Sequence, residues 1–318
     1  MKNAVQPQRT NIEESILSTA VYASLFSYIC TPEEIWRFLI TSKQVAFSSV
    51  QKAVRQLASS GDIFLDQGYV ILRKDERKMQ SLLKRRAETD IFTEVKRQQA
   101  ELIQKKLSWI PWISAVFFTG SVAAKNAVQS DDIDLCVITK KNRMWLTRFC
   151  VVLWTKLLRK YRLRGTRKAG EVSDMWCFNL WLDDAHLVLP AQIQTLYGAH
   201  ELFFMKTVFD RDSLHTKIIA NNGWAEQYLA NRYTELRQKH GGVVIHESFP
   251  NTGPLYWLKE RFLDVLEGAV RWIQRLFIDL HGNHAQISPG HAAFFPRNFS
   301  QEKLNMFTEE MASLSKSS

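Results

Sequence analysis

Two aspartates at the start of an apolar run constrain this chain more than any other feature. Asp132 and Asp134 stand on either side of Ile133, and the run continues from Leu135 to Thr139. Side chains two residues apart on a strand share one face, so both carboxylates point to one place while Ile133 and Leu135 enter the core. Paired carboxylates bind hard divalent cations, and Mg²⁺ prefers a few carboxylates together with substrate phosphates. We therefore expect Asp132 and Asp134 to bind Mg²⁺ or Mn²⁺.

A glycine-serine pair comes shortly before these aspartates. Gly120 and Ser121 follow an apolar, strand-like segment at 113–119. At a turn from strand to helix, a glycine lets backbone N–H groups and the serine hydroxyl approach a triphosphate without a Cβ in the way. The sequence therefore predicts that Gly120 and Ser121 bind the phosphates of a nucleoside triphosphate.

Taken together, the two segments resemble the polymerase-β-like nucleotidyltransferase superfamily. The resemblance lies in Thr119-Gly120-Ser121 followed by Asp132-Ile133-Asp134-Leu135. More narrowly, residues 28–35, 119–139, 143–148 and 199–202 are similar to a poorly characterised prokaryotic family that joins a winged helix to such a domain. The superfamily implies transfer of a nucleoside monophosphate from an NTP, with two metal ions bridging the triphosphate and the attacking hydroxyl. A competing G-x-x-x-x-G-K-[ST] phosphate loop does not occur in the sequence.

The third carboxylate that many active members carry on a later strand has no obvious counterpart. In the strand expected at 175–182, alternation points Asn179 at the metal site, and an asparagine lacks the charge that fixes a catalytic metal. Two interpretations stay open. Either Asp174 or Glu171, just before the strand, supplies the charge, or the domain binds nucleotide with little or no turnover.

Basic residues crowd the segment after the motif. From Lys140 to Lys168 there are eleven basic residues and no acid, within a chain of net charge +10. One-sided charge suggests a phosphate-rich partner, while a basic solubilising face is the alternative. Lys140, Lys141 and Arg143 directly follow the motif strand and are the candidates to meet phosphates or an acceptor.

The first 74 residues have the order of a winged-helix domain. Helical patterns cover 13–28, a short segment after the Thr31-Pro32 start, and 48–60, and a hairpin turns at Gln67-Gly68. A recognition helix at 48–60 would place three exposed side chains against DNA, namely Lys52, Arg55 and Gln56. Many winged helices bind protein instead, so both partners remain open.

The expected fold class is α+β. The chain divides into a winged-helix domain (11–74), a helical linker (75–110), a nucleotidyltransferase-type mixed sheet with helices (111–215) and a helical C-terminal region (216–318). Helical patterns at 199–209 and 255–280 belong to the part expected to be mostly helical.

Other features exclude several classes of protein. The longest apolar stretches are interrupted by charges and the N-terminus lacks a signal peptide, so we expect no membrane span and a cytoplasmic protein. The four cysteines are isolated and are interpreted as reduced core residues. Histidines 281, 284 and 291 are interpreted as loop residues rather than zinc ligands, and His200-Glu201 as ordinary core and surface residues.

The leading hypothesis is a metal-dependent nucleotidyltransferase. Its acceptor could be a small molecule, a protein side chain or a nucleic acid end. The first alternative is a nucleic-acid-binding regulator in which the fold binds nucleotide with little or no turnover. A nucleotide-modifying toxin or antitoxin component is the other.

Overall fold

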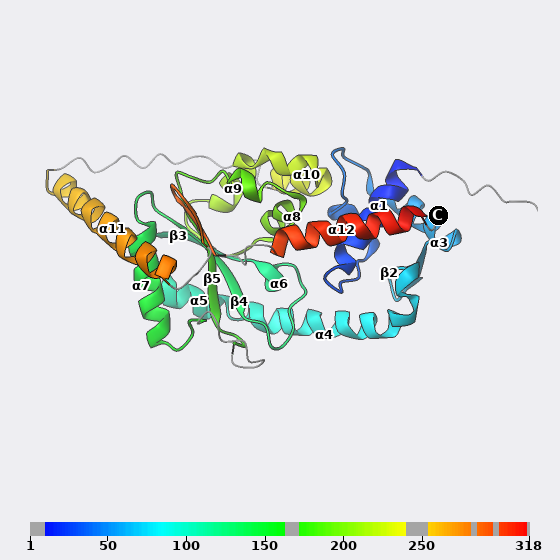
Figure 1. Ribbon diagram of the computed structural model, residues 1–318, viewed down its shortest axis with the longest axis horizontal. Helices are drawn as coiled ribbons and strands as arrows, with labels where there is room; N and C mark the ends of the chain where they lie inside the picture. The colour runs from blue at the N-terminus through cyan, green and yellow to red at the C-terminus, as the bar shows by residue number, and fades with distance from the viewer. Residues whose placement is uncertain (1–9, 163–171, 240–253, 281–284, 295–298, 317–318) are drawn as a thin grey trace, which may run out of the picture.

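The computed structural model describes residues 10–162, 172–239, 254–280, 285–294 and 299–316 (Figure 1). The fold is mixed α+β, as the sequence predicts. No helix among the described residues combines the length and the apolarity needed to cross a bilayer.

The N-terminal part forms three helices and a hairpin, in the order that the sequence predicts. The elements are α1 (Asn11–Ser24), α2 (Pro32–Arg37), α3 (Phe47–Ser59), β1 (Ile63–Asp66) and β2 (Tyr69–Leu72). Thr31 caps α2 in a reciprocal capping box with Glu34. The hairpin turns through Gln67 and Gly68, both with positive φ, and the Val70 N–H donates to the Cys30 carbonyl at 2.8 Å. The apolar faces of α1, α2, α3 and the hairpin share one core.

Two consecutive helical segments connect this part to a six-stranded sheet. After a short 3-10 turn (Arg73–Lys78) come α4 (Met79–Arg97) and α5 (Ala100–Leu107), which confirms the helical character expected for 75–110. Two buried basic residues attach α4 to its neighbours, one to the N-terminal helices and the other to the loops beside the sheet. Arg86 pairs with Glu34 at 2.9 Å, and Lys96 donates to Asp174 at 2.9 Å and to the Asp131 carbonyl at 2.7 Å.

The strands predicted at 113–119, 133–139 and 175–182 lie side by side. They are β3 (Ile113–Phe118), β4 (Ile133–Thr139) and β5 (Trp176–Asp183), in a sheet of order β6-β3-β4-β5-β8-β7. β3 and β4 are antiparallel, and β4 and β5 are parallel with Asp134 opposite Cys177. The short helix α6 (Gly120–Ala123) follows β3, and α7 (Met144–Leu157) follows β4.

The structure corrects the sequence prediction at three strands. Residues 199–209 are not one helix, because α8 (Leu196–Phe204) ends before β6 (Lys206–Asp210) pairs with β3. The C-terminal region is mostly helical, as expected, but it also contributes β7 (Gln286–Ser288) and β8 (His291–Ala293), which extend the sheet beyond β5. His291 therefore lies in a strand, whereas His281 and His284 are outside the described residues.

The remaining helices follow β6 in the chain and pack mostly against other helices. They are α9 (Leu214–Asn221), a 3-10 turn (Gly223–Gln227), α10 (Ala230–Lys239), α11 (Pro254–Leu280) and α12 (Phe299–Lys316). In Figure 1, α4 and α12 both run along the length of the molecule between the N-terminal helices and the sheet. α12 contacts both α1 and α8, and Phe307 packs against the cores of both parts. The helix α12 thus packs against both the N-terminal helices and the core beside the sheet.

Candidate functional site

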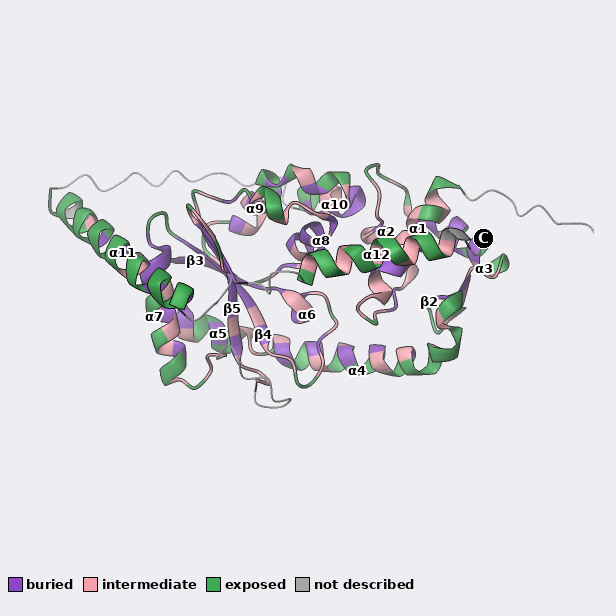
Figure 2. Ribbon diagram, viewed as in Figure 1, coloured by how far each residue is buried: buried purple, intermediate pink, exposed green. Residues whose placement is uncertain are grey.

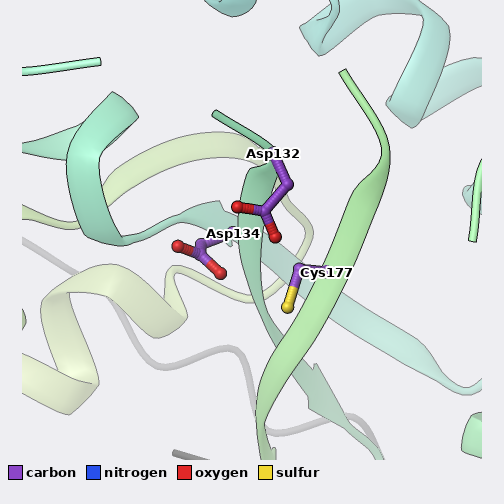
Figure 3. Close-up of side chains that lie close together, drawn as sticks. All are labelled: Asp132, Asp134 and Cys177. Atoms are coloured by element: carbon purple, nitrogen blue, oxygen red, sulfur yellow. The ribbon is translucent and has the colours of Figure 1, made fainter. Parts of the chain in front are cut away.

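The paired aspartates lie where the sequence predicts, at the start of β4. Asp132 and Asp134 point to one side of the sheet, and the parallel register adds Cys177 of β5 (Figure 3). One carboxylate oxygen from each aspartate and the Cys177 sulfur lie within 4.8 Å of one another. Among the described residues, this is the one group of three His, Cys, Asp or Glu side chains that is close enough to hold a metal.

Asn179 is the neutral neighbour that the sequence predicts on this face. Its Nδ2 donates to Asp134 Oδ1 at 2.8 Å, and its Oδ1 accepts from the Thr119 hydroxyl at 3.4 Å. A register shift between Leu135 and Cys136 lets Cys177 and Asn179 reach Asp134 together. The amide therefore neutralises no charge but holds Asp134 in one orientation.

Asp174 is not part of the cluster. It lies before β5 with a φ of +59°, and its carboxylate pairs with Lys96 of α4. Glu171 lies outside the described residues. The interpretation in which Asp174 supplies the third carboxylate does not fit this placement, because its charge is engaged by a buried lysine.

Arg162 is a member of the site that sequence reasoning missed. Its guanidinium pairs with Asp132 and lies 3.7 Å from the Cys177 sulfur. Burial, followed by the charge of Asp132, raises the pKa of Asp134 well above its usual range. Burial, with Asp134 and Asp132 adding to it, also raises the pKa of the Cys177 thiol. The cluster therefore holds more negative charge than Arg162 alone balances once both aspartates ionise.

Gly120 meets Asp134 at a distance that only glycine permits. It has a φ of +59°, and a Cβ built on it would lie 2.5 Å from Asp134 Oδ2. The Thr119 N–H donates to the Asp134 carbonyl at 3.0 Å, which fixes the turn against β4. The Gly-Ser turn and the aspartate pair, predicted from separate segments, are thus in direct contact.

A cavity of about 450 Å³ opens beside this contact. Gly120, Ser121 and Asp134 form part of its wall. The rest comes from α1, α2, α8, β6, α10 and α12 and from the segments that follow α1 and α6. Ring-bearing side chains line it, and so do several cations. The rings belong to Tyr22, Phe26, Tyr28, Phe38, Tyr197, His200, Phe204 and Phe299, and the cations to Arg37, Lys125, Lys206, Arg232 and Lys239.

His200 and Glu201, interpreted from sequence as ordinary residues, both line this cavity. The His200 ring stacks on Tyr22 with centroids 4.1 Å apart, which joins α8 to α1. The Glu201 carboxylate accepts hydrogen bonds from the Gly120 N–H and the Tyr197 hydroxyl. Burial raises the pKa of Glu201 to about 7, and those two hydrogen bonds oppose the rise.

Lys206 is the most distinctive cation of the cavity. Burial, followed by the charges of Arg232, Arg97 and Lys125, lowers its pKa to about 8. Arg232 pairs with Glu235, whereas no described carboxylate lies within ion-pair distance of Lys206 or Lys125. The cavity wall therefore contains two cations without a described carboxylate partner, Lys125 and Lys206. It also carries four carboxylates, those of Glu34, Asp134, Glu201 and Glu235.

The basic residues after β4 do not join this site. Lys140 and Lys141 follow the end of β4 opposite to the aspartates, a separation of about 20 Å along the strand. Lys140 pairs with Asp212 at 2.6 Å, and Arg143 is buried against Glu260 and Asp264 of α11. Their expected role at the nucleotide phosphates does not fit this placement, because β4 carries them away and acids of this chain engage Lys140 and Arg143.

The residues expected to contact DNA are exposed on α3. Lys52, Arg55 and Gln56 lie on the outer face, opposite the side that buries Val50 and Leu57. No described acid pairs with Lys52 or Arg55. The face is open to a partner.

Comparison with protein-family models, with curated proteins and with solved structures finds no match for this chain.

Proposed function

We propose that this chain is a metal-dependent nucleotidyltransferase that transfers a nucleoside monophosphate from an NTP to an acceptor hydroxyl. The observation that carries the proposal is the contact between Gly120 and Asp134 at the wall of a cavity lined by rings and cations. The fold assignments that accompany it, a polymerase-β-like domain behind a winged helix, are part of the same proposal.

The cavity has the size and the chemistry for a nucleotide. Small-molecule sites commonly enclose about 300–1,000 Å³, so about 450 Å³ is adequate. Aromatic side chains such as Phe38 and Phe204, with ring centroids 4.5 Å apart, offer flat surfaces to a base. Lys206 and Lys125 offer unpaired positive charge to phosphates. We place the base among the rings and the triphosphate beside Ser121, because the Gly120 N–H already donates to Glu201.

The donor set fits one hard divalent cation. Asp132 and Asp134 supply two carboxylates, and their mutual repulsion is the physical reason for a cation between them. When bound there, Mg²⁺ or Mn²⁺ would neutralise charge on the triphosphate and on the reacting oxygens. Cys177 stands where a third donor would complete the set, and a protonated thiol is a poor ligand for Mg²⁺.

The transfer has a simple balance. The acceptor oxygen forms a bond to the α-phosphorus, the bond from that phosphorus to the bridging oxygen breaks, and pyrophosphate leaves. The acceptor proton passes to a base, and Glu201, with a pKa near 7, is suited to take it. The remaining contribution of the protein is positioning and charge neutralisation.

The test is incubation of the full chain with each α-labelled NTP and Mg²⁺ or Mn²⁺, with candidate acceptors of each class. We expect pyrophosphate release and a labelled product that Asp134→Asn abolishes. Asp279→Asn, on exposed α11 outside the cavity, is the matched control and should keep full activity. Product formation unchanged by Asp134→Asn would refute the assignment.

A second candidate is a nucleic-acid-binding regulator that binds nucleotide with little turnover. Two observations favour it: Cys177 and Asn179 occupy the positions beside Asp134 where a third carboxylate would stand, and α3 exposes Lys52, Arg55 and Gln56. Duplex DNA binding by the parent should weaken steeply as salt rises and should be lost in the Lys52→Glu, Arg55→Glu double variant. Absence of DNA binding at low salt would remove this candidate.

A further inference from the structure

The helix α11 is largely exposed (Figure 2), and many of its exposed side chains are large and apolar. Seven outward positions of this helix follow alternating steps of three and four residues, with alanine at the fifth and large apolar side chains at the other six. They are Leu255, Leu258, Phe262, Val265, Ala269, Trp272 and Leu276. Steps of three and four place side chains in one line along a helix, as in the contact line of a coiled coil. We call this line the outer seam.

The opposite side of α11 is attached to the chain by buried apolar side chains such as Leu263 and Ile278 and by several polar contacts. Glu267 accepts the backbone N–H groups of Trp145 and Leu146 at 2.7 and 2.8 Å, which caps the start of α7. Gln274 donates to the Trp145 carbonyl at 2.8 Å, and Arg143 pairs with Glu260. The helix is therefore held by its inner side, and the outer seam is not needed to attach it.

The neighbouring helix α7 packs against α11 and also exposes three apolar side chains one turn apart, Phe149, Leu153 and Leu157. At about 200 Å² for a fully exposed large side chain, the outer seam alone presents roughly 700–800 Å² of apolar surface. Soluble monomers rarely expose more than about 600 Å² in one patch. Within the described part of the chain, nothing covers this surface.

The occupant is a second copy of this chain. We infer that α11 forms the interface of a two-fold symmetric dimer, in which the outer seam packs against the same seam of the partner. The available area matches the roughly 800 Å² per subunit that a stable interface buries, and a seam of this spacing pairs with an identical seam around a two-fold axis. Ala269, near the midpoint of the helix, allows the two helices to approach closely.

The charges on α11 argue against a lipid surface as the occupant. A helix that lies on anionic lipid carries mainly Lys and Arg on its polar side. The exposed charged residues of α11 have both signs, and acids such as Asp264 and Asp279 lie among the bases. The arrangement is typical of a helix that faces water on one side and protein on another.

Sedimentation velocity of the full-length chain across the micromolar range tests the inference, with one glutamate placed in the seam. Val265 is 74% exposed, so Val265→Glu should leave the fold of the monomer intact. Each subunit of the dimer would bring one buried glutamate into the interface, so the dimer dissociation constant should rise by about 100-fold or more. Ile91→Glu is the matched control, since Ile91 is 63% exposed on α4, away from the seam. Leu258→Glu is a second seam variant, and circular dichroism checks the fold of each.

We expect a parent dimer, monomers of both seam variants, and an unchanged Ile91→Glu dimer. A parent that is monomeric at all concentrations overturns the inference, and so does a dimer that persists in both folded seam variants. A monomeric parent that co-sediments with phosphatidylserine vesicles would assign the surface to a membrane instead. The result is independent of the nucleotidyltransferase assay.

Discussion

Asn179 donates a 2.8 Å hydrogen bond to Asp134, and in the proposed metal site this neutral amide lies where a third carboxylate would add a ligand. The amide fixes the orientation of Asp134 and adds no charge. A cation bound at this site therefore has two carboxylates of the described residues to hold it, and the electrostatic affinity of the site is correspondingly reduced.

Asn179→Asp should therefore increase metal affinity. The new carboxylate adds a ligand charge beside Asp134, and we expect Mn²⁺ to bind at least tenfold more tightly, about 1.4 kcal/mol. Without metal the variant should be less stable than the parent, because a hydrogen bond is replaced by repulsion between two carboxylates. Calorimetry with Mn²⁺ and thermal unfolding with and without the ion measure both effects. Asn179→Ala is the control, and equal affinity in all three proteins would contradict the assignment of the site.

The paired aspartates should be needed for nucleotide binding in the presence of metal. Asp132→Asn and Asp134→Asn each remove one ligand charge, so each should abolish detectable Mg²⁺–ATP binding in calorimetry while circular dichroism stays unchanged. Asp132→Asn also releases Arg162 from its ion pair. Binding like that of the parent in both variants would mean that the site lies elsewhere.

Gly120→Ala should disrupt the site because the added Cβ would lie 2.5 Å from Asp134 Oδ2 at a positive φ. We expect a loss of about 1–3 kcal/mol of stability together with the loss of nucleotide binding. Gly268→Ala in α11 is the matched control, since a Cβ there meets no atom within 4 Å. The control should gain about 0.5–1 kcal/mol from helix propensity. Two variants of equal stability and equal binding would show that the Gly120 contact is unimportant.

The local part of the site could be predicted from sequence because it follows from strand geometry. Asp132, Asp134 and Gly120 belong to short patterns in which a period of two and a glycine turn fix which side chains meet. Alternation likewise placed Asn179 on the correct face of β5. These inferences need no knowledge of distant residues.

The rest of the site depends on register and on contacts between distant segments. Cys177 reaches the aspartates through the pairing of β4 with β5, and Lys206 enters the cavity because β6 pairs with β3. Tyr22 comes from the N-terminal helices. The placements of Lys206 and Tyr22 have no signal in a single sequence, whereas the alternation that selects Asn179 also puts Cys177 on the same face.

The basic residues after β4 are close to the aspartates in sequence but not in space. Lys140 is six residues after Asp134, but β4 separates the two by its whole length.

The short strands β7 and β8 have three residues each, which is too few for a pattern to distinguish them from a loop.

Glu201 should make the stability of this chain depend on pH in a way that a single substitution removes. Burial raises the pKa of Glu201 to about 7 in the folded state, whereas an unfolded glutamate titrates near 4.5. Between these values the folded state binds more protons than the unfolded state, so the contribution of Glu201 to the free energy of unfolding falls as pH rises from about 4.5 to about 7.

Glu201→Gln keeps an acceptor for the Gly120 N–H and has no charge to bury. We expect the variant to match the parent near pH 4.5 and to exceed its stability by about 1–3 kcal/mol above pH 7. Urea unfolding across this pH range measures the difference, and Glu302→Gln on the exposed face of α12 controls for the loss of a surface carboxylate. A difference between Glu201→Gln and the parent that stays constant with pH would show that Glu201 is not buried as a charge beside Gly120.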